Sequence, residues 1–168
     1  MNIIAMIPAR MGSERLPKKN LALLNGQPLI SYAIEAAKKS GVFSRVVVNS
    51  DGVAFHSVAQ RYGVEFYLRP QALGSSETKS DDVVYDFMLK HPSEIVAWVN
   101  PISPLQTGEE VRNVIDYFID QQLDSLITVK NEQLHCVYES KPLNFTPNGL
   151  FAKTQDLTPV QSFVYSVM

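Results

Sequence analysis

Short apolar segments alternate with segments of helical period along most of this chain, and this alternation constrains the fold most strongly. Five apolar segments have the length of buried β-strands, at residues 3–7, 45–49, 64–68, 95–99 and 126–129. Four segments carry apolar residues on one helical face, at residues 28–40, 53–62, 80–90 and 107–121. Strands separated by such helices are typical of a parallel sheet with right-handed crossovers. The pattern therefore predicts an α/β fold with a mostly parallel sheet.

Residues that favour helix ends lie at the expected boundaries. Pro28 stands in the opening turn of the first helical segment, and Gly41 follows that segment as a C-cap. Ser80 is placed to cap the third segment, and Thr107 with Glu110 forms a capping box for the fourth. These residues support the predicted bounds.

The character of the chain changes after about residue 130, where prolines and an Asn148-Gly149 turn separate short β-like pieces. We expect an α/β domain over residues 1–130 and a small β-rich arm over residues 131–168. The arm holds apolar residues that so short a segment cannot bury alone, namely Phe145, Leu150, Phe151, Val160, Phe163 and Tyr165. The chain stops on the apolar run 163–168, so we expect it to be a fragment.

Composition excludes several classes of protein. The net charge is −2, and no basic field indicates nucleic acid or an anionic membrane as a partner. The single cysteine, Cys136, excludes an internal disulfide. The N-terminal apolar run is too short for a signal peptide, and no apolar run has the length of a membrane span. We therefore expect a cytoplasmic protein.

The segment after the first predicted strand is the most informative one. In an open α/β sheet, ligands bind beyond the carboxyl ends of the strands. Residues 8–20 combine basic side chains, among them Arg10, Arg15 and Lys19, with Gly12. A glycine lets backbone amides approach a phosphate, and the cations neutralise its charge. The segment matches neither the P-loop nor the dinucleotide-binding pattern, and the alternative to a phosphate site is a solvated basic loop.

Four motifs follow the predicted strands. The first runs Ile7-Pro8-Ala9-Arg10-x-Gly12-Ser13-x-Arg15-Leu16-Pro17-x-Lys19-Asn20. The others are Asn49-Ser50-Asp51-Gly52, then Arg69-Pro70-x-x-Leu73 followed by Ser80, and Asn100-Pro101-Ile102-Ser103-Pro104-Leu105-Gln106. Together they cover almost all of residues 3–107, and they resemble the motifs of the sugar-acid cytidylyltransferases, the family of acylneuraminate and 3-deoxy-manno-octulosonate cytidylyltransferases.

The resemblance implies a Rossmann-like three-layer nucleotidyltransferase fold with a β-rich dimerisation arm that borders the sugar site of a homodimer. It implies an enzyme that joins CMP from CTP to an acidic 2-keto sugar for surface glycan biosynthesis, with Mg²⁺ as cofactor and release of pyrophosphate. Arg10 and Lys19 would act on the phosphates, while Arg69 and Ser80 would hold the cytosine. The remaining substrate-binding candidates are Ala9, Gly12, Ser13, Arg15, Asn20, Asp51, Asn100, Ser103 and Gln106.

The chain also departs from the family pattern. Asn100 stands where glutamine is usual, and Gln106 stands where arginine is usual, so the identity of the sugar stays open. The family's acidic metal ligands belong to an Asp-x-Asp element beyond residue 168. Two alternatives therefore remain: a catalytically impaired nucleotide-binding relative, and a sugar-phosphate nucleotidyltransferase that uses another nucleoside triphosphate.

Other polar or aromatic residues have plainer interpretations. His56 and His91 lack a paired ligand at metal spacing, and we expect both at the surface. His135 and Cys136 are adjacent, so in a strand they point to opposite faces. Trp98, in an apolar strand, is expected in the core.

Overall fold

The computed structural model describes residues 1–13, 16–147, 150, 152–164 and 166–168. These residues form two compact units, one of Met1–Leu126 with Ser166–Met168 and one of Ile127–Tyr165. From the sequence we drew a boundary at residue 130, whereas the second unit begins at Ile127 and the last three residues belong to the first. None of the described helices is long and apolar enough to span a membrane.

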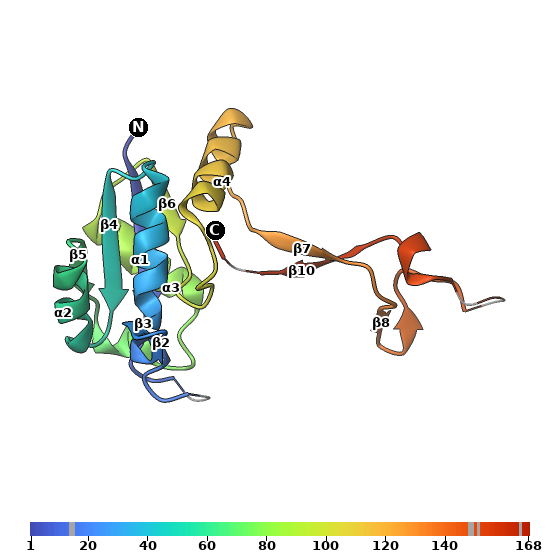
Figure 1. Ribbon diagram of the computed structural model, residues 1–168, viewed down its shortest axis with the longest axis horizontal. Helices are drawn as coiled ribbons and strands as arrows, with labels where there is room; N and C mark the ends of the chain where they lie inside the picture. Colours follow the sequence, from blue (N-terminus) through green and yellow to red (C-terminus); the bar gives the residue numbers. More distant parts are fainter. Residues whose placement is uncertain (14–15, 148–149, 151, 165) are drawn as a thin grey trace. The chain divides into compact units, whose positions relative to one another are not determined.

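The first unit is built on four parallel strands in the order β5-β4-β1-β6 (Figure 1). They are β1 Ile3–Ala9, β4 Arg45–Ser50, β5 Glu65–Leu68 and β6 Ile95–Trp98. The register pairs Ala9 with Ser50 and Ser50 with Leu68, so the carboxyl ends meet at one edge. Four of the five predicted strands and the parallel sheet are confirmed.

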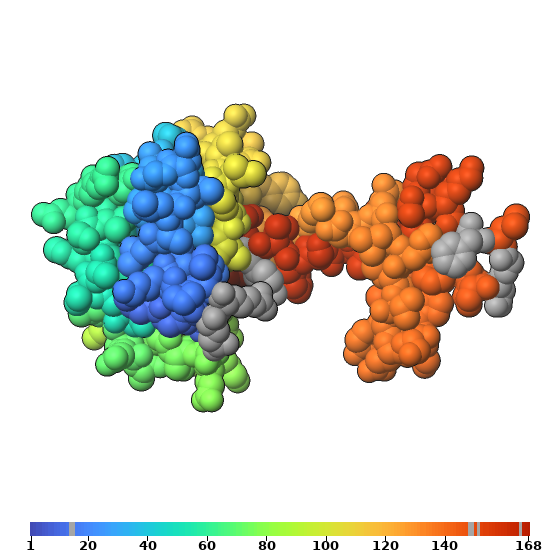
Figure 2. Space-filling model, turned by 60° about the horizontal axis from the view of Figure 1, so that its bottom comes forward, coloured from blue at the N-terminus to red at the C-terminus, as the bar shows by residue number. Residues whose placement is uncertain are grey.

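Helices cover both faces of this sheet and give the predicted three layers. They are α1 Leu29–Ser40, α2 Ala54–Arg61, α3 Ser80–Lys90 and α4 Gly108–Asp120. Helices α1, α2 and α4 share two apolar clusters with one face, whereas Phe87 of α3 packs on the other. Figure 2 shows α1 in blue beside the yellow start of α4, where a Cβ on Gly108 would lie 2.8 Å from the backbone of Lys39.

The alternation of side chains explains the unbroken apolar run in β1. Ile3, Ala5 and Ile7 belong to the clusters of α1, α2 and α4, whereas Ile4 and Met6 belong to the α3 cluster. All five are at most 5% exposed. A strand covered on both faces is apolar at every position, so this run indicated a central parallel strand.

Most of the predicted helix ends are confirmed. Thr107 and Glu110 form the capping box, and Gly41 ends α1 with a φ of 69°. Ser80 is not the N-cap of α3, because Lys79 takes the extended cap conformation and Ser80 is the first helical residue. Outside the sheet, two small antiparallel hairpins pair β2 Leu23–Leu24 with β3 Gln27–Pro28 and β8 Val137–Tyr138 with β9 Lys141–Pro142.

The fifth predicted strand, 126–129, is wrong. The strand in this region is β7 Val129–Glu132, and it pairs antiparallel with β10 Val160–Phe163 in the second unit. Pairing with a distant segment, which no local pattern specifies, decided where this strand forms. At the outer side of β6 the neighbour is instead the chain end, where Val167 forms an antiparallel bridge with Val99. The sheet is therefore mostly parallel, as predicted.

The prediction that His91 lies at the surface is wrong, because its ring is partly buried at the end of α3. His56 is exposed, as predicted. The His91 ring stacks on Phe87 with centroids 4.4 Å apart, and its Nδ1 lies 3.0 Å from Nη2 of Arg45. A guanidinium only donates, so Nδ1 accepts and the proton of the neutral ring is on Nε2. Arg45 in turn donates two hydrogen bonds to Glu65.

We expect protonation of His91 to lower the free energy of unfolding in mildly acidic solution. Burial and the nearby Arg45 hold the pKa of His91 below its ordinary value. The unfolded chain therefore binds the proton first, and the contribution of His91 is lost as the pH falls below about 6.5. Urea unfolding between about pH 7 and about pH 5 measures this loss of stability. Glu65 does not interfere in this pH window, because the hydrogen bond from Arg45 lowers its pKa.

The variant His91→Gln should flatten this pH dependence, and the matched variant His56→Gln at the exposed ring should keep it. A steeper loss of stability in His91→Gln than in the unchanged protein would contradict the assignment.

Candidate functional site

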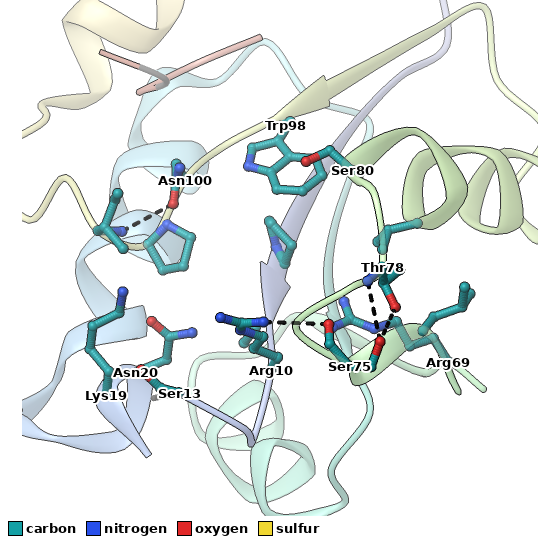
Figure 3. Close-up of a pocket in the computed structure, with 16 residues that line it drawn as sticks. Arg10, Ser13, Lys19, Asn20, Arg69, Ser75, Thr78, Ser80, Trp98 and Asn100 are labelled. Atoms are coloured by element: carbon teal, nitrogen blue, oxygen red, sulfur yellow. Dashed lines mark hydrogen bonds between the residues drawn. The ribbon is translucent and has the colours of Figure 1, made fainter. Parts of the chain in front are cut away.

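A cavity of about 240 Å³ lies at the carboxyl edge of the sheet (Figure 3). Segments that follow β1, β5 and β6 contribute to it, as does the start of α3. Its lining residues are Pro8, Ala9, Arg10, Ser13, Lys19, Asn20, Arg69, Leu73, Ser75, Thr78, Ser80, Val83, Trp98, Asn100, Pro101 and Ile102. The cavity thus occupies the position expected for a ligand in an open α/β sheet.

The structure gathers most of the predicted site residues around this cavity. Those that line it are Ala9, Arg10, Ser13, Lys19, Asn20, Arg69, Ser80 and Asn100. Gly12, Asp51, Ser103 and Gln106 do not line it, and Arg15 lies outside the described residues. Residues far apart in sequence, such as Arg10 and Asn100, therefore meet at one site because the strand ends share an edge.

Two basic side chains from the segment after β1 reach the cavity. Arg10 directly follows β1, and its Nη1 donates to the carbonyl of Ser75 over 3.4 Å. Lys19 opens the short 3₁₀ helix Lys19–Leu21, and no ion pair binds it within the described ranges. Both side chains are partly exposed. Their charges are therefore available to an anionic ligand.

Arg69 is the buried cation of the site, with a side chain 4% exposed. Its Nη1 donates to the carbonyl of Asn49 over 3.2 Å, and its Nη2 lies 3.7 Å from Oδ1 of Asp51. Burial lowers the pKa of the guanidinium from its ordinary value, and the Asp51 carboxylate opposes this effect. Arg69 thus holds a fixed positive charge beneath the cavity.

Asp51 supports the site from behind and does not line it. Its Oδ1 accepts a hydrogen bond from the backbone N–H of Met11 over 3.0 Å, besides its ion pair with Arg69. A Cβ on Gly74 would collide with the same carboxylate, so a glycine is required there. Asp51 therefore joins the segment after β1 to Arg69, and its role is to position both.

The turn after β6 explains why only part of the fourth motif reaches the cavity. Asn100 Oδ1 accepts from the N–H of Ile102 over 3.3 Å, while the Asn100 carbonyl accepts from Ser103. Gln106 N–H donates to the Ser103 carbonyl over 3.2 Å. The turn thus keeps Asn100 at the cavity and carries Ser103 and Gln106 away from its wall.

Three lining residues hold buried polar atoms without a hydrogen-bond partner among the described residues. These atoms are Asn20 Oδ1, Arg69 Nε and Trp98 Nε1. Buried polar groups are nearly always paired in folded proteins, so their concentration at one cavity indicates a polar ligand.

Sequence reasoning missed several members of the site, chiefly Ser75, Thr78 and Trp98. Ser75 and Thr78 hydroxyls lie 2.9 Å apart in the turn that precedes α3. Trp98 was predicted in the core; it packs on the α3 cluster but also lines the cavity. A usable signal existed, because Trp98 lies two residues before Asn100, and alternate residues of a strand share a face.

The described residues do not by themselves fit the expected Mg²⁺. Within those ranges no group of three or more His, Cys, Asp or Glu side chains is placed to hold a metal ion. Asp51 accepts from Met11 and pairs with Arg69, while Asp81 and Asp82 lie in the first turn of α3.

Comparison with known sequences identifies relatives among the cytidylyltransferases and the CMP-sugar-acid synthases. N-acylneuraminate cytidylyltransferase of Escherichia coli O18:K1:H7 is 33% identical over 117 residues, covering 69% of this chain and 28% of that protein. CMP-N,N'-diacetyllegionaminic acid synthase of Legionella pneumophila is 35% identical over 122 residues, covering 69% of this chain and 53% of that protein. The chain thus spans about half the length of these relatives or less.

Solved structures and a family model extend this likeness. The structure of CMP:2-keto-3-deoxy-manno-octonic acid synthetase complexed with CTP superposes with a TM-score of 0.74 and 19% identity, over 99% of this chain and 73% of that one. This similarity shows the nucleotidyltransferase fold. The model of the cytidylyltransferase family matches residues 4–156. With most of its length matched and with sugar-acid enzymes as its relatives, the chain belongs to the cytidylyltransferase family.

Proposed function

We propose that this chain binds CTP and forms the nucleotide-binding part of an enzyme that transfers CMP to an acidic 2-keto sugar for surface glycan biosynthesis. The observation that carries the proposal is the cavity at the sheet edge, where Arg10, Lys19 and Arg69 meet buried polar atoms that lack partners. A triphosphate supplies the charge that these cations need, and a nucleoside supplies hydrogen-bonding groups.

In the proposed reaction, the anomeric hydroxyl oxygen of the sugar forms a bond to the α-phosphorus of CTP. The bond from that phosphorus to the bridging oxygen breaks, pyrophosphate leaves, and the hydroxyl proton passes to solvent. Catalysis of such transfers depends mainly on positioning and on neutralising phosphate charge. Arg10 and Lys19 are suited to the β- and γ-phosphates because both line the cavity from the segment after β1.

We also propose Mg²⁺ as the cofactor, because the substrate itself binds this ion. Triphosphate oxygens bind this ion readily, so we expect it to enter with CTP.

The class of the sugar is proposed by analogy with the relatives, which act on neuraminic, legionaminic and octulosonic acids. The cytoplasmic location expected from sequence stays a prediction.

The experiment that tests the proposal is calorimetry with CTP, UTP and GTP in the presence of Mg²⁺. We expect CTP to bind most tightly, because Ser80 at the start of α3 lines the cavity and gives one base edge a specific partner.

Ser80→Ala should reduce the CTP-to-UTP preference by roughly fivefold or more, as for a lost hydrogen bond. Ser76→Ala, at an exposed serine of the preceding turn, is the matched control. Equal affinity of the unchanged protein for CTP and UTP would refute the cytidine assignment.

We also propose a homodimer that forms through the second unit. This unit exposes many apolar side chains, namely Val129, Leu134, Val137, Tyr138, Leu143, Leu150, Phe163 and Val164. Of the residues named from sequence, Leu150 is 98% and Phe163 is 59% exposed, while Phe151 and Tyr165 lie outside the described residues. A twofold interface covers such groups on both subunits at once.

Light scattering at micromolar concentration should give twice the mass of the 18.8 kDa chain. The double variant Tyr138→Glu with Leu143→Glu should shift the protein towards monomer, because it places charges in the interface. Tyr85→Glu with Leu89→Glu is the matched control, since these α3 side chains are similarly exposed. A monomer for the unchanged chain would reject the dimer.

A further inference from the structure

A second cavity, of about 480 Å³, adjoins the first in the same unit. It runs along β6 between α3 and α4, and its lining is largely apolar, with Val84, Val96, Val114, Phe118 and Leu126 among its members. Two residues line both cavities, Ser80 and Trp98. Trp98 is therefore the larger of the two residues that lie where the spaces meet.

Trp98 is well supported in this position. It is the last residue of β6, partly buried, and packs against the cluster of Ile4, Met6, Val47 and Phe87. Its backbone N–H donates to the carbonyl of Met168 over 2.7 Å. The sheet thus holds the backbone of Trp98, and the core cluster supports its side chain.

The first cavity, at the carboxyl edge of the sheet, has two chemically distinct ends. Figure 3 draws Trp98 next to Ser80 and away from Lys19 and Asn20. Ser80 and Trp98 are uncharged, whereas Lys19 at the other end is a cation. In a site for a nucleoside triphosphate, the cationic end suits the phosphates, and the neutral end suits the base.

The indole N–H strengthens this assignment. Trp98 Nε1 is buried, and no described residue accepts its hydrogen bond, although a buried tryptophan N–H usually finds a partner. The N–H lies in the plane of the indole, so a bound nucleotide can offer its base to the indole face and a polar atom elsewhere on the ligand to the N–H. A purely aliphatic occupant would leave the N–H unpaired.

We infer that Trp98 is a base-contacting residue that packs its indole against the base of the bound nucleotide and closes the pocket from the second cavity. This inference rests on the proposed binding of CTP. Aromatic contacts with a base are worth roughly a tenfold change in affinity or more. Trp98 is thus a residue that raises the affinity of the site for a nucleotide.

The sequence contains one tryptophan, so intrinsic emission reports on Trp98 alone. Titration with CTP, excited at the red edge of indole absorption, should change the emission saturably with the Kd that calorimetry gives. Free tripolyphosphate should bind with little change in emission, because it occupies only the cationic end. N-acetyltryptophanamide corrects for absorption by CTP.

Variants supply a second readout. Trp98→Ala should weaken CTP binding by roughly tenfold or more and leave tripolyphosphate binding unchanged, whereas Trp98→Phe should retain most of the CTP affinity. Phe118→Ala is the matched control, because Phe118 lines only the second cavity. If Trp98→Ala does not fold, Trp98→Phe and the emission of the unchanged protein decide the question.

The outcomes separate this inference from the proposed function. Binding of CTP by calorimetry with unchanged Trp98 emission, or with full affinity in folded Trp98→Ala, overturns the role of Trp98 and leaves CTP binding standing. Absence of CTP binding to the unchanged protein overturns both.

Discussion

Replacing Arg69 with methionine is expected to lower the free energy of unfolding by about 3 kcal/mol, because it strands a buried carboxylate. Asp51 has a side chain only 10% exposed, and its cationic partner is Arg69. Methionine keeps much of the buried volume of arginine but none of its charge. Affinity for CTP should fall in the same variant, since Arg69 also lines the cavity.

Urea unfolding measures this effect, and two further variants interpret it. Arg45→Met breaks the more exposed pair with Glu65 and should cost less than about 1 kcal/mol. Arg69→Met combined with Asp51→Asn should recover part of the loss, because the stranded charge is gone. Equal losses in Arg69→Met and Arg45→Met would show that the burial of the pair does not matter.

Arg10→Ala and Lys19→Ala are expected to weaken CTP binding by about 1.5–3 kcal/mol each, or roughly 10- to 150-fold in Kd. In the complex that we propose, each variant lacks one charge-assisted contact to a phosphate. Both side chains are partly exposed, so the free energy of unfolding should change by less than about 0.5 kcal/mol. Calorimetry at fixed ionic strength measures the affinity.

Lys90→Ala provides the control, because Lys90 is an exposed cation in the last turn of α3 and does not line the cavity. If Lys90→Ala weakens CTP binding as much as Lys19→Ala does, the effect reflects the net charge of the protein rather than a phosphate contact.

The sheet and its edge were predictable because local patterns and one topological rule suffice for them. The short apolar segments and the helical segments between them predicted the parallel sheet. Given parallel strands, the residues that follow them must meet at one edge, so Arg10, Arg69 and Asn100 were expected at the same site.

The errors arose where a non-local partner or a second environment decided the outcome. Residues 126–129 have an apolar pattern, yet strand formation followed pairing with Val160–Phe163. Trp98 was assigned to the core because its strand is apolar, although one side chain can touch both a core cluster and a cavity. His91 was expected at the surface because no nearby residue in sequence pairs with it, whereas the fold brings Arg45 and Phe87 against its ring. Asp51 was expected at the ligand, but the N–H of Met11 takes its carboxylate.

The bridge between Val99 and Val167 has a consequence for the order of folding. Residues 127–165 separate the two halves of this bridge in sequence, so β6 gains its outer neighbour only after that whole stretch has been synthesised. Closing a long loop costs only slightly more than closing a short one, but contacts distant in sequence form late. We therefore expect the edge of β6 to be the last part of the sheet to become protected from hydrogen exchange. Insertions within 127–165 should leave the other strands to form at their usual rate.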